Sequence, residues 1–166
     1  MRDRIIGASK GIGLQATRQV LEAGRQAHAL ARSFALNAIG PALIMKHVLP
    51  RLPRTGKAVF ATLSARVRSI GDNRLGGWYA CRASKADLNQ LVRTAAIELA
   101  RRSPDALCVA LHPGTDATAL SAPFAATELE THPPAAAARH LLAVVDRLTA
   151  DANGGFFDWG GQPVPR

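Results

Sequence analysis

A glycine-rich stretch near the start of the chain carries the first chemistry that the sequence suggests. Residues 5–14 run from two isoleucines through Gly7, Gly11 and Gly13 into an apolar-periodic segment, which is the order of a strand, a phosphate-binding loop and a helix. Glycines there permit a tight turn and let the backbone approach a pyrophosphate. The spacing differs from the usual dinucleotide fingerprint, and glycines also mark ordinary turns, so both interpretations stay open.

Two basic residues indicate which dinucleotide this loop would bind. Lys10 lies within the loop, and Arg32 follows the short apolar run of residues 26–31, which we expect to be the second strand. An acidic residue after that strand would bind a ribose 2'-hydroxyl, whereas an arginine accommodates a 2'-phosphate. The sequence therefore predicts NADP rather than NAD, unless both residues are ordinary surface charges.

A third candidate is the hydroxyl of Ser64. It follows residues 57–63, an apolar run typical of a strand buried on both faces. Ligands of open α/β sheets bind at the carboxyl ends of the strands. Ser64 is therefore expected at a ligand-binding edge.

The elements that must position these residues alternate between strand and helix. Helical spacing predicts helices over residues 12–21, 34–52, 83–102 and 135–148, and apolar runs predict further strands over 106–112 and 155–159. This alternation favours an α/β fold with a doubly wound parallel sheet. The 166 residues suit one domain, residues 1–166. A polar loop is expected over residues 65–77, and the mixed segment 115–134 would shape the substrate pocket.

Composition argues against several other classes of function. The net charge is +9, but the basic residues are scattered and aromatic residues make up only 5%, so we expect no nucleic-acid partner. The sequence has neither an apolar run of the roughly 18 residues that a membrane helix needs nor a signal-peptide pattern, so we expect no membrane contact and a cytoplasmic location. Cys81 and Cys108 form no metal spacing.

Five blocks in a fixed order then resemble the short-chain dehydrogenase/reductase family, and the second half resembles its C-factor-type branch. The blocks are residues 7–13, residues 37–41, Ser64, residues 82–85, and Pro113-Gly114 followed by Thr118. The resemblance implies that Asn37, Ser64 and Lys85 are catalytic, with Cys81 at a fourth catalytic position. It implies the following cofactor-binding residues: Gly7, Ser9, Lys10, Gly11, Ile12, Gly13, Arg32, Lys85, Pro113, Gly114 and Thr118.

The same resemblance implies an activity and an assembly. Members of the family transfer hydride between NADP(H) or NAD(H) and a small-molecule carbonyl or alcohol, and the protein would be an oxidoreductase of this type. The two long helices, residues 34–52 and 83–102, resemble the family's dimer-forming pair. We therefore expect a homodimer or homotetramer.

The first departure from the family is at the catalytic acid. The family's tyrosine lies four residues before the lysine, one helical turn away, and here that position is Cys81. Tyr79 is six residues from Lys85 and lies off that helix face. A thiol is acidic enough to transfer a proton but ends several bonds short of the phenol oxygen.

The second departure is a missing segment between Ser33 and Phe34, where family members have two further strands with their helices. For the sheet to remain continuous, the first strand must pair with residues 57–63, which gives the strand order 2-1-3-4-5. The chain is then expected to be an impaired oxidoreductase. The alternatives are a catalytically inactive dinucleotide-binding pseudoenzyme and a non-functional deletion product.

Overall fold

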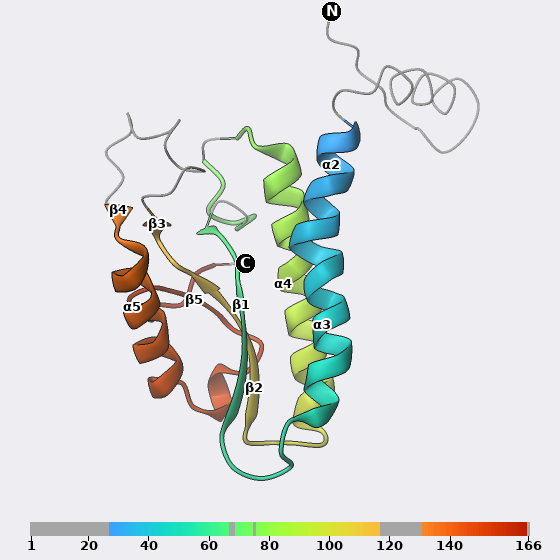
Figure 1. Cartoon of the computed structure of the whole chain (residues 1–166), viewed down its shortest axis with the longest axis vertical. Coiled ribbons are helices and arrows are strands. Elements are labelled where there is room, and N and C mark those ends of the chain that lie inside the picture. The colour runs from blue at the N-terminus through green and yellow to red at the C-terminus, as the bar shows by residue number, and fades with distance from the viewer. Residues whose placement is uncertain (1–26, 67–68, 75, 117–130, 166) are drawn as a thin grey trace, which may run out of the picture.

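The computed structural model describes residues 27–66, 69–74, 76–116 and 131–165 (Figure 1). Helices, strands and helical turns alternate through the described chain. In order they are α2 (Ala27–Phe34), the π-helical turn η1 (Ala35–Ile39), α3 (Gly40–Val48), the 3-10 turn η2 (Leu49–Arg51), β1 (Ala58–Leu63), α4 (Tyr79–Ala100), β2 (Ala106–His112), β3 (Thr115–Asp116), β4 (Thr131–His132), α5 (Pro134–Arg147), the 3-10 turn η5 (Ala150–Ala152) and β5 (Phe156–Asp158).

Three parallel strands form the described sheet, in the order β1-β2-β5. Leu63 is the register partner of Leu111, and His112 is the partner of Asp158. The strands therefore end together at one carboxyl edge. The short strands β3 and β4 pair separately, at the two ends of the segment 117–130.

Side chains alternate between two helical layers along these strands. Ala106, Cys108 and Ala110 of β2 join a core with Leu88 of α4 and Met45 of α3. Intervening residues of β2 pack with Val144 of α5 on the other face. Figure 1 shows α3 and α4 on one side of the sheet and α5 on the other. The α/β fold with a parallel sheet is thus confirmed.

Asn153 fastens α4 to β2 within this arrangement. Its Oδ1 accepts a hydrogen bond from the Cys108 backbone N–H at 2.8 Å, and its Nδ2 donates to the Ala96 carbonyl at 2.9 Å. Burial raises the pKa of the adjacent Cys108 thiol to about 12, because a thiolate is poorly solvated in an apolar core. Cys108 is therefore a packing residue and not a nucleophile.

The expected second strand at residues 26–31 is wrong. Residues from Ala27 onward are helical, and α2 continues through η1 into α3 as one long rod beside α4 (Figure 1). Ala and Leu dominate residues 27–31 and are strong helix formers, and no breaker separates them from the following helix. A short apolar run does not distinguish a strand from a buried helix segment by periodicity alone.

This correction bears on the strand order. The last three strands of the expected order 2-1-3-4-5 are neighbours as predicted. The first predicted strand, at Ile5 and Ile6, lies outside the described residues, and the second is helical. The junction between Ser33 and Phe34 falls inside α2, so the helix crosses it.

The helix across this junction predicts the effect of a proline. Ser33→Pro should destabilise the fold by about 3 kcal/mol or more, because proline removes a helical N–H donor and clashes with the preceding turn. Urea unfolding followed by circular dichroism measures the change in the free energy of unfolding. Ser33→Ala is the matched control and should be neutral or slightly stabilising. Equal stability of the two variants would contradict a helix at this junction.

Candidate active site

Two of the catalytic candidates, Ser64 and Lys85, lie at the carboxyl edge of the sheet. Ser64 follows β1, and its backbone N–H donates to the Leu111 carbonyl at 2.7 Å. The residue is only 5% exposed. Its Oγ has no hydrogen-bond partner among the described residues. A buried hydroxyl without a partner is uncommon, and this one is available to donate to an oxygen of a bound ligand.

Lys85 reaches the same edge from α4. Its Nζ donates to the Leu63 carbonyl at 2.8 Å, one residue before Ser64. The contact holds a positive charge at the carboxyl end of the parallel strand β1. The structure therefore brings together two residues that the sequence placed 21 positions apart.

Asn37 lies on the π-helical turn between α2 and α3. The Gly40 N–H bonds to the Ala35 carbonyl five residues earlier, which is the π pattern, and such turns are frequent at functional sites. Asn37 Nδ2 donates to Ser84 Oγ at 3.0 Å, and Ser84 Oγ donates to the Cys81 carbonyl at 3.2 Å. Asn37 is thus anchored to α4 through Ser84.

Cys81 lies on α4 one turn before Lys85, as the helical spacing predicts, and is partly buried. Tyr79 is the first residue of α4, and its side chain is 84% exposed. The phenol therefore does not pack into the site. Tyr79 is the single tyrosine of the sequence, so no other tyrosine can take the place of the family's catalytic one.

The start of α4 is fixed by a turn that the sequence did not reveal. Gly76, Gly77 and Trp78 all have positive φ angles. Arg82 donates to the Gly76 and Gly77 carbonyls, each at 2.9 Å, and its guanidinium lies over the Trp78 ring. The helix consequently begins at Tyr79 and not at the expected residue 83.

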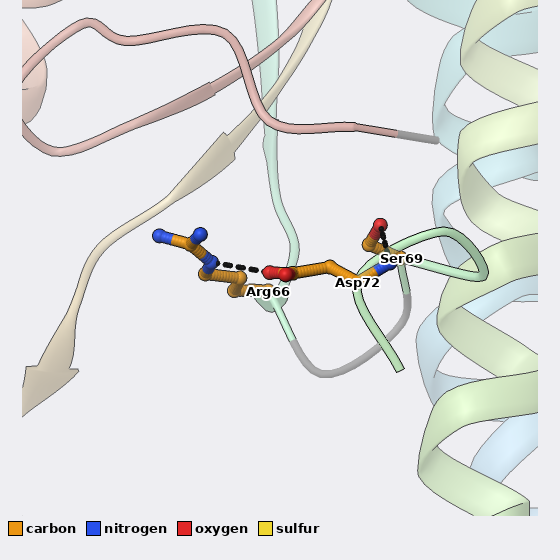
Figure 2. A network of polar contacts seen from close by, with 3 residues as sticks. All are labelled: Arg66, Ser69 and Asp72. Atoms are coloured by element: carbon orange, nitrogen blue, oxygen red, sulfur yellow. Dashed lines mark hydrogen bonds and ion pairs between the residues drawn. The ribbon is translucent and has the colours of Figure 1, made fainter. Parts of the chain in front are cut away.

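The loop after β1 has its own polar network (Figure 2). Arg66 Nε donates to Asp72 Oδ2 at 2.7 Å, and the Asp72 N–H donates to the buried Ser69 Oγ at 3.0 Å. The hydrogen bond and the charge of Asp72 raise the pKa of the Arg66 guanidinium, and Asp158 at the end of β5 adds to the effect. Arg66 therefore lies near the same edge of the sheet.

The cofactor-binding candidates are only partly described. Pro113 and Gly114 directly follow β2, and Gly114 has a φ of 91°, which favours glycine. Arg32 is exposed on α2, so its expected position at the end of a strand is wrong. The remaining candidates lie outside the described residues: Gly7, Ser9, Lys10, Gly11, Ile12, Gly13 and Thr118.

The parallel sheet between two helical layers, with polar residues at its carboxyl edge, defines a Rossmann-type α/β protein. Residues 5–141 match the family model described as enoyl-(acyl carrier protein) reductase. C-signal of Myxococcus xanthus is 37% identical over 136 residues, which cover 82% of this chain and 78% of that protein. The chain belongs to the short-chain dehydrogenase/reductase family.

Other relatives are longer than this chain. The 1-hydroxy-2-glutathionyl-2-methyl-3-butene dehydrogenase of Rhodococcus sp. (strain AD45) is 34% identical over 125 residues, which cover 75% of this chain and 53% of that protein. A carbonyl reductase from Pseudomonas aeruginosa PAO1 is 30% identical with a TM-score of 0.65, covering 87% of this chain and 58% of that one. NADPH-bound carbonyl reductase from chicken fatty liver, at 23% identity, shares the fold with a TM-score of 0.72, covering 99% and 64%.

Two absences complete the description. No helix in the described part of the chain is long and apolar enough to cross a membrane. Within residues 27–66, 69–74, 76–116 and 131–165, no group of His, Cys, Asp and Glu could hold a metal ion.

The bridge through Ser84 predicts a stability effect. Ser84→Ala should lower the free energy of unfolding by about 1 to 3 kcal/mol, because it leaves the partly buried Asn37 amide without this acceptor. Thr94→Ala is the control: Thr94 is exposed on α4 and donates only to its own helix, at the Gln90 carbonyl. That change should stay within about 0.5 kcal/mol. Equal losses in urea unfolding would show that the bridge does not stabilise the site.

Proposed function

We propose that this protein is an NADP(H)-dependent oxidoreductase that interconverts a small-molecule carbonyl and its alcohol, with turnover limited at Cys81. The observation that carries the proposal is the buried Ser64 hydroxyl, which has no partner among the described residues, at the end of the strand whose Leu63 carbonyl binds the Lys85 ammonium. Together they offer a hydrogen-bond donor and a positive charge to an oxygen that gains negative charge. The carbonyl reductases with the same fold support the proposal.

The residues present fit a dinucleotide at this edge. Residues 7–13 would hold the pyrophosphate, and Pro113 and Gly114 lie at the carboxyl end of β2, where nucleotides bind in such sheets. Lys85 would bind the nicotinamide ribose, and Thr118 the carboxamide. When bound, the cofactor supplies the hydride. Preference for NADP over NAD now depends on Lys10, since Arg32 is not at a strand end.

Within this site the chain's own residues orient and polarise the substrate. Ser64 donates its hydroxyl hydrogen to the carbonyl oxygen and so withdraws electrons from the carbon. Lys85 adds a positive charge beside that oxygen. Asn37, which lies on the π-helical turn, would anchor a water relay to Lys85. The thiol of Cys81 is too short to protonate the same oxygen directly.

A pseudoenzyme that binds the dinucleotide without turnover is the second candidate. The replacement of the tyrosine by Cys81 and the outward position of Tyr79 favour it. The two candidates differ in one measurement, because only the oxidoreductase consumes NADPH when a ketone is added. The cytoplasmic location also stays a prediction.

Restoring the phenol tests the oxidoreductase. Cys81→Tyr should reduce an activated ketone at least about tenfold faster than the parent, because a positioned acid contributes 10²- to 10⁴-fold. The loss of NADPH absorbance measures the rate. Cys81→Phe is the matched control, since it fills the same space without a hydroxyl. If the tyrosine variant is no faster than the phenylalanine variant, the acid at position 81 does not limit turnover.

We further propose that the protein is a homo-oligomer through α2 and α3. Large apolar side chains are exposed along this rod: Leu30, Leu36, Ile39, Leu43, Ile44 and Val48. Contiguous exposed apolar surface of this kind usually marks an interface.

A charge on this surface should separate the subunits. Leu43→Glu is expected to yield monomers at micromolar concentration, because a carboxylate buried at an apolar interface is costly. Arg139→Glu, at an exposed position of α5 on the other side of the sheet, is the control and should leave the assembly intact. Light scattering coupled to size exclusion gives the mass. A monomeric parent protein would refute the proposed assembly.

A further inference from the structure

Three polar residues form a row across the carboxyl ends of the three parallel strands. Ser64 is the first residue after β1, and His112 is the last residue of β2. The residues that precede them, Leu63 and Leu111, are register partners, so Ser64 and His112 are neighbours in the same register. His112 is in turn the register partner of Asp158 on β5. Register neighbours in a parallel sheet lie on adjacent strands, about 4.8 Å apart, with side chains on the same face.

The alternation of side chains places this row on the face that α4 covers. Even-numbered positions of the three strands, Phe60, Cys108 and Phe156 among them, belong to the core beneath α4. Ser64, His112 and Asp158 continue the same parity at the strand ends. His112 is therefore on the side of the sheet where Lys85 contacts the end of β1.

Asp158 is held in place at the far end of the row. Its Oδ1 accepts hydrogen bonds from the backbone N–H groups of Gly160, at 2.9 Å, and Gln162, at 2.8 Å. Asp158 therefore holds a fixed carboxylate in the register position next to His112. Among the described residues, Lys85 from α4 and Arg66 from the loop after β1 also bring charge to this end of the sheet, and Cys81 lies one helical turn before Lys85.

We propose that His112 donates the proton to the substrate oxygen bound at Ser64, in place of the tyrosine that position 81 lacks. The inference rests on the proposed carbonyl reduction. The carbonyl carbon accepts a hydride from NADPH, and the π electrons of the carbonyl move to its oxygen. That oxygen takes the proton of the His112 imidazolium, whose nitrogen keeps the bonding pair. Water then returns a proton to the neutral imidazole.

Histidine suits this step for two reasons. Its imidazole extends further from the backbone than the thiol of Cys81, and it comes from the strand next to Ser64 and not from the helix above. Its ordinary charge change falls between about pH 5 and 8, so both protonation states are accessible near neutrality. Residual turnover of the parent protein thus depends on His112.

The test compares NADPH-dependent reduction of an activated ketone by the parent, His112→Asn and His112→Gln, with His47→Asn as the matched control. His47 is exposed on α3, away from the strand ends. Both His112 variants should lose about 10²-fold in rate, while NADPH fluorescence titration gives an affinity within about twofold of the parent. Thermal melts check that each variant is folded. If His112→Asn disrupts the strand end, the rate of His112→Gln is compared with that of the parent instead.

A pH series supplies a readout that a structural role would not move. The imidazolium is the donor, so the parent rate should fall as the pH rises through the titration of His112. The C2 proton of His112, followed by NMR in the cofactor-free protein, should titrate with the same midpoint. In the Cys81→Tyr background the phenol supplies the proton, so His112→Asn should cost much less than it does in the parent.

Several outcomes would overturn the inference. Folded His112 variants that match the parent rate, or a rate independent of pH across the imidazole range, would exclude His112 as the donor. An inactive parent beside an active Cys81→Tyr variant would do the same while leaving the oxidoreductase site standing. If both the parent and Cys81→Tyr are inactive, the proposed function fails and the inference fails with it.

Discussion

The packing of α4 on β2 is the contact on which the rest of the structure depends. One stripe of α4 is buried against the sheet, formed by Ser84, Leu88, Val92, Ala96 and Leu99. Because helix residues four apart share a face, the same stripe carries Cys81 and Lys85 to the carboxyl edge. The contact therefore serves stability and chemistry together: it buries the core and brings the lysine to the Leu63 carbonyl, one residue before Ser64.

The sequence predicted this part of the molecule well, for a physical reason. Strands β1 and β2 are continuous apolar runs, and α4 has a long helical period, so their types follow from pattern alone. Ser64 could be assigned because it follows a buried strand. Lys85 and Asn37 came from resemblance. Ser84 and His112 were missed, although His112 ends a strand as Ser64 does.

Other features depend on contacts that no local pattern contains. The run at residues 27–31 is helical because it joins a longer helix that packs on α4, which a short apolar stretch does not reveal. The early start of α4 depends on Arg82 bonding to two glycine carbonyls. The same apolar run led to the prediction that Arg32 follows a strand, which this chain does not form there.

A titration with NADPH tests most directly whether the carboxyl edge is a dinucleotide site. Isothermal calorimetry on the folded parent protein should show saturable binding of one NADPH per chain, tighter than that of NADH. Lys85→Ala should weaken it, because we propose that the lysine binds the ribose. The account would be contradicted if folded protein, with an intact circular dichroism spectrum, showed no saturable binding up to about 1 mM NADPH. That limit corresponds to a binding free energy weaker than about 4 kcal/mol.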